Sequence, residues 1–183
     1  MAITQTQLSE RDRKMAKITR AQKWYVAGAA YRLNRQLIST GVFEPEDADD
    51  ARLYRQFLQE FNSTQPLTQP MRAYRGIGQG TNTMGRGGFA SASLDERVAE
   101  SFVEVRLVKS PYSWEYGRMT EIRTGEYLVL DIQPGVRVMN IDGAQNEVVI
   151  EPDIEIEITN TIRSNGSKDQ STTIWMTIRK SKL

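Results

Sequence analysis

Gln145 and Glu147 stand two residues apart at the start of an apolar strand candidate, EVVIE at 147–151. Because side chains alternate along a strand, these two lie on one face. A carboxylate beside a carboxamide could bind a sugar diol and contact an incoming nucleophile. An ordinary strand start, with polar residues ahead of the core, is the alternative interpretation.

Arg75 belongs to another short strand candidate, MRAYRG at 71–76. Alternation places its side chain on the same face as Met71 and Ala73. A guanidinium near an apolar face must be paired or bind an anion, because burying it alone is very costly. Its planar fork suits a phosphate or a carboxylate. An arginine at the sheet edge or on the surface is the simpler alternative.

Two serines lie in GFASASLDERVAESF, at 88–102. Ser93 and Glu96 have the Ser-x-x-Glu spacing of a capping box, which predicts a helix that Ser93 caps. Ser91 points to the same side of the extended segment but belongs to no cap. It is either a buried hydroxyl with a backbone partner or a group that holds a catalytic side chain in place.

The residue types that are missing narrow the chemistry. The 183-residue chain has no cysteine and no histidine, which excludes disulfides, zinc sites built on sulfur and Ser-His-Asp or Cys-His machinery. Any reaction must therefore use carboxylates, Arg, Lys, Tyr or hydroxyl groups. The net charge of +1 argues against bulk electrostatic binding to nucleic acid.

No membrane segment or leader is expected. Apolar runs are short, and the first residues, MAITQTQLSERDRK, have no apolar stretch after a basic start. We expect a cytoplasmic protein or one delivered into a host or target cell. The terminal Ser181-Lys182-Leu183 matches a peroxisomal address, although three residues match easily by chance.

Helices are predicted to precede the strands. One apolar stripe at helical spacing predicts a helix over 9–40 that ends at Gly41; its members are Met15, Ile18, Ala21, Tyr25, Ala29, Leu33 and Leu37. A second helix is predicted from Pro45, with acidic residues in its first turn. The stripes fit packing against the rest of the fold. The basic face of the first helix is either solvated or binds a partner.

The second part of the chain reads as strands. Beyond 71–76 and 147–151, alternation or apolar runs bounded by turn residues predict strands at 126–132, 136–141, 154–159 and 172–178. The whole is therefore α+β, with a helical portion over 1–62 and a strand-rich core over 63–183. The glycine-rich segment 76–88 fits neither nucleotide-binding fingerprint and is either a flexible surface loop or a loop whose backbone approaches a ligand.

The order of these features resembles a known family. An arginine on an early strand, a Ser-x-Ser segment and a Gln-x-Glu before a later strand resemble the mono-ADP-ribosyltransferases of the arginine–serine–glutamate class. The matching segments span roughly residues 70–180: YRG, GGFASASLDERVAESF, YLVLDIQPGVRVMNIDGAQNEVVIEP and STTIWMTIRK. The Gln-x-Glu form is most similar to the Rho-modifying clostridial exoenzymes, and also to guanine-modifying and phage transferases. The resemblance implies two packed, mainly antiparallel sheets with N-terminal helices.

The resemblance also implies a role for each candidate residue toward NAD, the substrate. Arg75 would hold NAD through its phosphate or the nicotinamide-side ribose, and the backbone of Gly76 would meet the nicotinamide carboxamide. Ser91 would hydrogen-bond Glu147 and orient it. Glu147 would stabilise the cation formed as nicotinamide leaves, while Gln145 would position the acceptor.

Further contacts with NAD are expected from the aromatic stretch SPYSWEYGR, at 110–118. Tyr112 would stack on a ring and Arg106 would meet a phosphate; Trp114, Tyr116 and Arg118 are alternatives for these roles. The sequence departs from the family at Ala92, where a threonine is usual, and at Asp142, where the Rho-modifying enzymes carry an aromatic residue. The second departure puts a Rho-like target in doubt.

The predicted function is that of an NAD-dependent mono-ADP-ribosyltransferase of the toxin or phage effector type. It would cleave the nicotinamide–ribose bond and transfer ADP-ribose to a macromolecular acceptor, with hydrolysis of NAD as a side activity. The acceptor is expected to be protein, with a guanine base in nucleic acid as the alternative; no metal and no membrane are implied. A catalytically inactive binding or structural module on the same fold is the remaining alternative.

Overall fold

The N-terminal helical part is broken rather than continuous. The computed structural model describes residues 18–77, 84–109, 119–142 and 146–182, so residues 9–17 of the predicted 9–40 helix lie outside it. From there the chain forms α2 (Arg20–Trp24), a π-helical turn η1 (Tyr25–Ala29) and α3 (Ala30–Thr40). Gly28, at φ 124°, interrupts the helix in a conformation that favours glycine. Gly41, at φ 74°, ends α3 as predicted.

The second helix, α4 (Ala48–Ser63), begins after Pro45 rather than at it. Asp47 is its N-cap, and the Asp47 side chain accepts a hydrogen bond from the backbone N–H of Asp50 at 2.8 Å. A carboxylate in this position satisfies an otherwise unpaired N–H and complements the helix dipole, so it fixes where the helix starts. No helix in the described part of the chain is long and apolar enough to span a membrane.

A seven-stranded sheet makes up most of the rest of the molecule. Its strands are β1 (Met71–Ile77), β2 (Ala90–Ser93), β5 (Glu126–Ile132), β6 (Val138–Asp142), β7 (Glu147–Ile150), β8 (Ile154–Arg163) and β9 (Thr172–Lys180). Their order is β6-β7-β2-β1-β5-β9-β8, and every pair is antiparallel except β5 with β9. The α+β class and the mainly antiparallel strands are confirmed.

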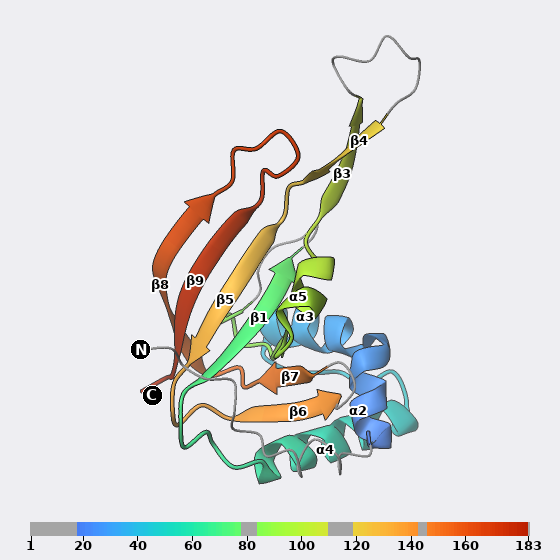
Figure 1. Cartoon of the computed structure of the whole chain (residues 1–183). Coiled ribbons are helices and arrows are strands. Elements are labelled where there is room, and N and C mark those ends of the chain that lie inside the picture. Colours follow the sequence, from blue (N-terminus) through green and yellow to red (C-terminus); the bar gives the residue numbers. More distant parts are fainter. Residues whose placement is uncertain (1–17, 78–83, 110–118, 143–145, 183) are drawn as a thin grey trace.

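The sheet is folded across itself. In Figure 1 the short strands β6 and β7 run across the long strands β1, β5, β9 and β8. Both ends of the sheet contribute to one apolar cluster, which includes Ala73, Leu130, Val148, Ile150 and Ile178. The two packed layers expected from the sequence are thus the two ends of one hydrogen-bonded sheet.

A second sheet, which the sequence did not reveal, has two strands. β3 (Val105–Lys109) and β4 (Met119–Arg123) pair in an antiparallel ribbon that extends away from the body of the protein (Figure 1). The segment 110–118, which joins them, lies outside the described residues.

The helices cover the β6–β7 end of the sheet. Their apolar side chains meet those of the strands in a cluster that includes Tyr25, Phe57, Phe89, Met139 and Val149. Tyr25 and Phe57 stack with their ring centroids 4.6 Å apart and their planes 5° from parallel. The apolar stripes therefore serve packing, as predicted, and they bring the middle of the first helical segment against β2 and β7.

A short helix, α5 (Glu96–Ser101), lies on β1 and β5 and corrects one prediction. Its N-cap is Asp95, whose side chain accepts from Arg97 N, so Ser93 is not the capping residue. Ser93 is still part of β2 and is paired on both sides, which delays the turn into the helix. The Ser93 hydroxyl instead accepts a hydrogen bond from Asp95 N at 3.0 Å.

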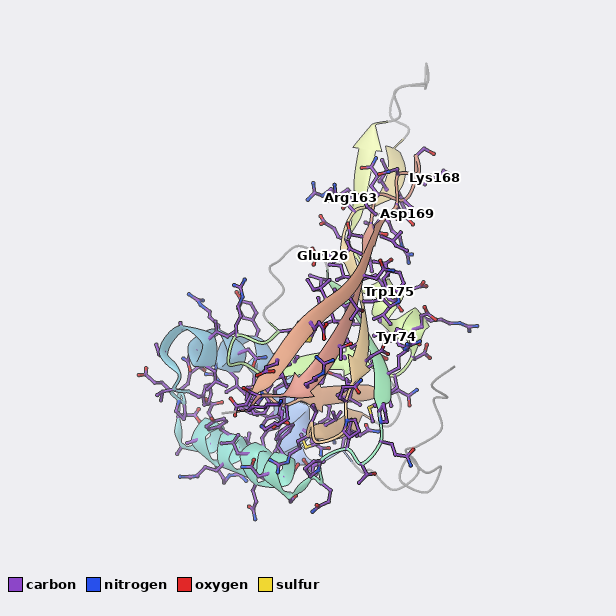
Figure 2. All side chains as sticks on the ribbon, turned by 90° about the vertical axis from the view of Figure 1, so that its left-hand side faces the viewer. Tyr74, Glu126, Arg163, Lys168, Asp169 and Trp175 are labelled. Atoms are coloured by element: carbon purple, nitrogen blue, oxygen red, sulfur yellow. The ribbon has the colours of Figure 1, made fainter. Side chains whose placement is uncertain are left out.

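Close packing of α5 on β1 requires a glycine. A Cβ added to Gly76 would lie 2.1 Å from the carbonyl oxygen of Ala99, far inside van der Waals contact. On the other flank of the helix, Tyr74 and Trp175 lie along the same side of the sheet (Figure 2). Helix α5 thus stands between two faces of the molecule, and each face carries a cavity.

Candidate functional site

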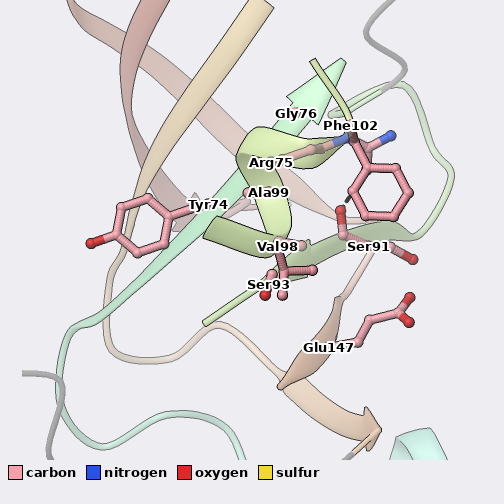
Figure 3. Close-up of a pocket in the computed structure, with 10 residues that line it drawn as sticks. Tyr74, Arg75, Gly76, Ser91, Ser93, Val98, Ala99, Phe102 and Glu147 are labelled. Carbon is pink, nitrogen blue, oxygen red and sulfur yellow. Dashed lines mark hydrogen bonds between the residues drawn. The ribbon is translucent and has the colours of Figure 1, made fainter. Parts of the chain in front are cut away.

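A cavity of about 240 Å³ lies between α5 and the strands β1, β2 and β7. Arg75, Gly76, Ser91 and Glu147, four of the residues predicted from the sequence, line it. Figure 3 shows Arg75, Ser91 and Glu147 projecting to one side of the strands with Phe102 beside them, while Tyr74 points the opposite way.

Strand order and register bring these side chains together. β1, β2 and β7 are neighbours in the sheet, and Ser93 lies opposite Tyr74 on one side and opposite Glu147 on the other. Ser91 of β2 lies opposite Val149 of β7. Three segments far apart in the sequence therefore place a guanidinium, a hydroxyl and a carboxylate in one pocket.

Arg75 is fixed from the second strand. Its Nη1 donates to the carbonyl oxygen of Ser91 at 2.8 Å. A guanidinium has five N–H donors, so this bond orients the fork and leaves donors for a ligand. Burial lowers the pKa of Arg75, and the nearby carboxylate of Glu147 acts against that shift. The arginine remains a cation beside a carboxylate, as an anion-binding group must.

The Ser91 hydroxyl has a neighbour that sequence reasoning did not find. Its Oγ lies 3.4 Å from Tyr25 Oη. The bond from Ser91 to Glu147 that the resemblance implied stays a prediction. Tyr25 is fully buried, and burial raises the pKa of its hydroxyl more than the hydrogen bond with Ser91 lowers it. The hydroxyl therefore keeps its proton at neutral pH. In the sequence Tyr25 was one member of an apolar stripe, and nothing else marked it.

Glu147 is the first residue of β7 and is held by the turn before it. Asn146 adopts φ 52°, a left-handed conformation that asparagine tolerates better than most residues. The Asn146 carbonyl accepts a hydrogen bond from Leu94 N at 2.9 Å, which ties this turn to the link between β2 and α5. The negative charge of Glu147 acts on the pKa values of both Tyr25 and Arg75, consistent with one electrostatic cluster.

Of the remaining predicted residues, the structure describes Arg106 alone. Arg106 lies exposed on β3, where its Nε donates to Glu104 at 2.8 Å, and it does not line the cavity. Gln145 and Tyr112 lie outside the described residues, as do the alternatives Trp114, Tyr116 and Arg118. Their roles stay predictions. The described residues contain no group of three or more Asp and Glu side chains that could hold a metal ion.

Comparison with known proteins identifies the fold. No protein-family model and no curated protein matches the sequence, but solved structures do. Exoenzyme S of Pseudomonas aeruginosa, solved with human 14-3-3 protein beta and carba-NAD, superposes with a TM-score of 0.58 at 15% identity, over 86% of this chain and 70% of that one. The chain has the fold of the bacterial ADP-ribosyltransferase toxins.

Two further ADP-ribosyltransferase toxins support the same assignment. C3larvin of Paenibacillus larvae gives a TM-score of 0.54 at 14% identity, over 90% of this chain and 96% of that one. The Vis toxin of Vibrio splendidus, solved with agmatine, gives 0.55 at 19% identity, over 92% and 78%. The ADP-ribosyltransferase-like fold expected from the sequence is confirmed, and similarity at this identity concerns the fold alone.

Proposed function

We propose that this protein is an NAD-dependent mono-ADP-ribosyltransferase. It would cleave the bond between nicotinamide and ribose and transfer ADP-ribose to a macromolecular acceptor. One observation carries the proposal: Arg75, Ser91 and Glu147, on three adjacent strands of an ADP-ribosyltransferase-like fold, line the same cavity. That a structural neighbour was solved with an NAD analogue supports NAD as the substrate.

The cavity suits one end of NAD rather than the whole dinucleotide. Its volume of about 240 Å³ is below the roughly 300–1,000 Å³ of pockets that enclose a complete ligand. Val98 of α5 and Phe102, which follows the helix, offer an apolar wall to a flat ring, and Gly76 also lines the cavity. Nicotinamide and its ribose would occupy this space, with Arg75 holding a phosphate or the ribose.

The reaction needs a fixed negative charge beside the sugar. When the bond between ribose C1′ and the nicotinamide nitrogen breaks, its electron pair leaves with nicotinamide and positive charge develops on the ribose. Glu147 would stabilise that charge, as carboxylates do in glycoside cleavage. A lone pair of the acceptor would then form the new bond to C1′, and the acceptor group would lose its proton. Gln145 would position this acceptor.

Ser91 and Tyr25 would act as positioning residues. The Ser91 carbonyl holds Arg75, and its hydroxyl contacts Tyr25. Ser91 thereby connects the guanidinium to the helical part of the protein. Its own strand, β2, also pairs with β7, the strand that carries Glu147. Contacts of this kind, which support the catalytic residues from behind, hold the reacting groups within a fraction of an ångström of their productive positions.

A protein acceptor is the favoured hypothesis, and the product tests it. The purified protein is incubated with cell lysate and NAD labelled in its adenylate part, and the labelled product is then divided between a protease and a nuclease. Label released by the protease alone supports transfer to protein. Label released by the nuclease alone identifies nucleic acid as the acceptor, which is the guanine alternative.

A further inference from the structure

A second cavity, of about 470 Å³, lies on the opposite flank of α5 from the first. Helix α5, the long strands β1, β5 and β9, the end of β4 and the loop before β9 surround it. Figure 2 shows Tyr74, Trp175 and Asp169 along this flank of the sheet. The lining residues used below are Tyr74, Tyr127, Trp175, Glu96, Glu100 and Asp169.

Aromatic rings form the floor of this second cavity. Tyr74 and Tyr127 are stacked, with their centroids 6.2 Å apart and their planes 19° from parallel, and Trp175 packs against the same cluster. Tyr127 is 8% exposed, and its Oη makes no hydrogen bond of good geometry within the part of the chain that the structure describes. Burial and, after it, the nearby carboxylate of Glu96 raise the pKa of this hydroxyl, so it stays protonated beside Glu96. A buried hydroxyl left in this state is costly, so it indicates a ligand that offers a hydrogen bond.

Carboxylates dominate the charge around the rings. Glu96 and Glu100 lie one helical turn apart on α5, and Asp169 adds a third carboxylate from the loop. Of the two arginines that line the cavity, Arg72 is already engaged by both carboxylate oxygens of Asp131, at 2.7 and 3.1 Å. Arg123 approaches Glu100 only to 4.0 Å. Asp169 accepts hydrogen bonds from Ser171 N at 3.0 Å and Ser171 Oγ at 2.6 Å, which are uncharged donors. The three carboxylates of the lining therefore still outnumber Arg123, the arginine of the lining that is not held by Asp131.

We propose that this second cavity binds the side chain of an arginine presented by a protein partner. A guanidinium is a planar cation that stacks on aromatic rings and donates hydrogen bonds in several directions at once. It would lie against Tyr74 and Trp175, donate to Glu96 and Glu100, and give the Tyr127 oxygen its missing partner. A phosphate or other anion would be repelled by the same carboxylates, and a neutral ligand would leave their charge unmatched.

The position of the cavity gives the inference a consequence for the protein's function. Val98 and Ala99 of α5 line the first cavity, while Glu96 and Glu100 of the same helix line the second. A partner held through its arginine would therefore lie beside the proposed NAD site. The inference goes beyond the proposed function, since it rests on a different cavity and stands whether or not NAD is cleaved.

The test uses the indole N–H of Trp175 as a reporter in ¹H–¹⁵N NMR spectra of the whole protein, assigned with Trp175→Phe. The probe is N-acetyl-arginine methylamide, and the neutral control is N-acetyl-citrulline methylamide. We expect a saturable shift of the indole signal with the arginine probe and none with the citrulline probe. In the Glu96→Gln/Glu100→Gln variant the Kd should rise at least about tenfold, because two charge-assisted bonds are lost. Glu155→Gln, which removes an exposed carboxylate on β8, should leave the Kd unchanged.

A second variant guards against disturbance of α5 by the two glutamate changes. Tyr127→Phe keeps the stacked ring and removes only the oxygen, and it should weaken binding of the arginine probe about two- to tenfold. The absence of a saturable shift in the wild type would overturn the proposal. So would equal shifts with the arginine and citrulline probes, or an unchanged Kd in both the double variant and Tyr127→Phe.

Discussion

Tyr25 Oη lies 3.4 Å from Ser91 Oγ, so a residue of the N-terminal helical part contacts one that lines the candidate site. The helix kinks within the segment η1 that begins at Tyr25, because Gly28 has a left-handed backbone at φ 124°. The helical part thus contacts the candidate site through the buried hydroxyl of Tyr25, in addition to its apolar packing on the strands.

Removing that hydroxyl should slow the reaction without unfolding the protein. In Tyr25→Phe the ring still stacks on Phe57, but Ser91 loses its contact. We expect kcat for nicotinamide release to fall about two- to tenfold, the value of one neutral hydrogen bond, with KM for NAD little changed. Tyr31→Phe is the matched control, since Tyr31 is 76% exposed. An unchanged kcat in Tyr25→Phe would show that the contact serves packing alone.

Replacing Arg75 by lysine should weaken NAD binding. Lysine keeps the charge but loses the planar fork that bonds to the Ser91 carbonyl and would hold a phosphate or ribose. Isothermal titration with NAD should give a Kd at least about tenfold higher than that of the wild type. Arg97→Lys, an exposed change on α5, should bind as the wild type does. Equal affinities for Arg75→Lys and wild type would remove Arg75 from the proposed site.

A single methyl group at residue 76 should displace α5. In Gly76→Ala the new Cβ would meet the Ala99 carbonyl at 2.1 Å, and backbone at that distance must move. Urea unfolding should show a loss of about 1–3 kcal/mol or more in the free energy of unfolding. Gly166→Ala is the control, because its nearest contact would be an ordinary 3.4 Å. Equal stabilities of the two variants would contradict the packing described.

Asp50 should stabilise the helical part in a pH-dependent way. It accepts hydrogen bonds from Trp24 Nε1 at 2.7 Å, Arg32 Nη2 at 2.6 Å and Glu46 N at 2.9 Å. Burial acts to raise the pKa of Asp50, but these bonds hold it below its ordinary value of 3.8. The ionised carboxylate therefore stabilises the fold above about pH 3.8, and this contribution is lost as the pH falls through the folded-state pKa.

Asp50→Asn measures this contribution. At pH 7 urea unfolding should give a free energy of unfolding about 1–3 kcal/mol below that of the wild type. The difference between the two should shrink as the pH is lowered below about 3.8, because only the wild type loses a charge there. Asp153→Asn, an exposed substitution, should match the wild type throughout. A difference that stays constant down to low pH would show that the ionised state of Asp50 is not what stabilises the protein.

Much of the fold was predictable because its signals are local. Alternating or continuous apolar runs predicted β1, β5, β6, β7 and β9 to within two residues of their observed bounds, whereas β8 runs four residues beyond its predicted end. The ribbon of β3 and β4 was missed, because each strand has only five residues, a short run for a periodic pattern. The capping box at Ser93 was wrong, because pairing on both sides keeps that residue in the sheet. Such pairing is a tertiary effect that overrides a local motif.

The candidate site, too, could be predicted only in part. Arg75, Ser91 and Glu147 could be selected by residue type and order, and strand order then brought them to one cavity. The contact between Ser91 and Tyr25 could not be predicted, because it depends on a helix break and on how the helices lie across β2 and β7. The second cavity, with Tyr127 and Trp175, depends on the packing of α5 and was likewise invisible in the sequence.

The most direct test of the central claim is the release of nicotinamide from NAD by the purified protein, measured beside Glu147→Gln. This substitution keeps the size of the side chain and removes the negative charge that would stabilise the ribosyl cation. With lysate present as a source of acceptor, we expect release by the wild type and a rate at least about a hundredfold lower for Glu147→Gln. Exposed Glu155→Gln should retain the wild-type rate. Equal release by wild type and Glu147→Gln, or none from the wild type, would contradict the proposed function.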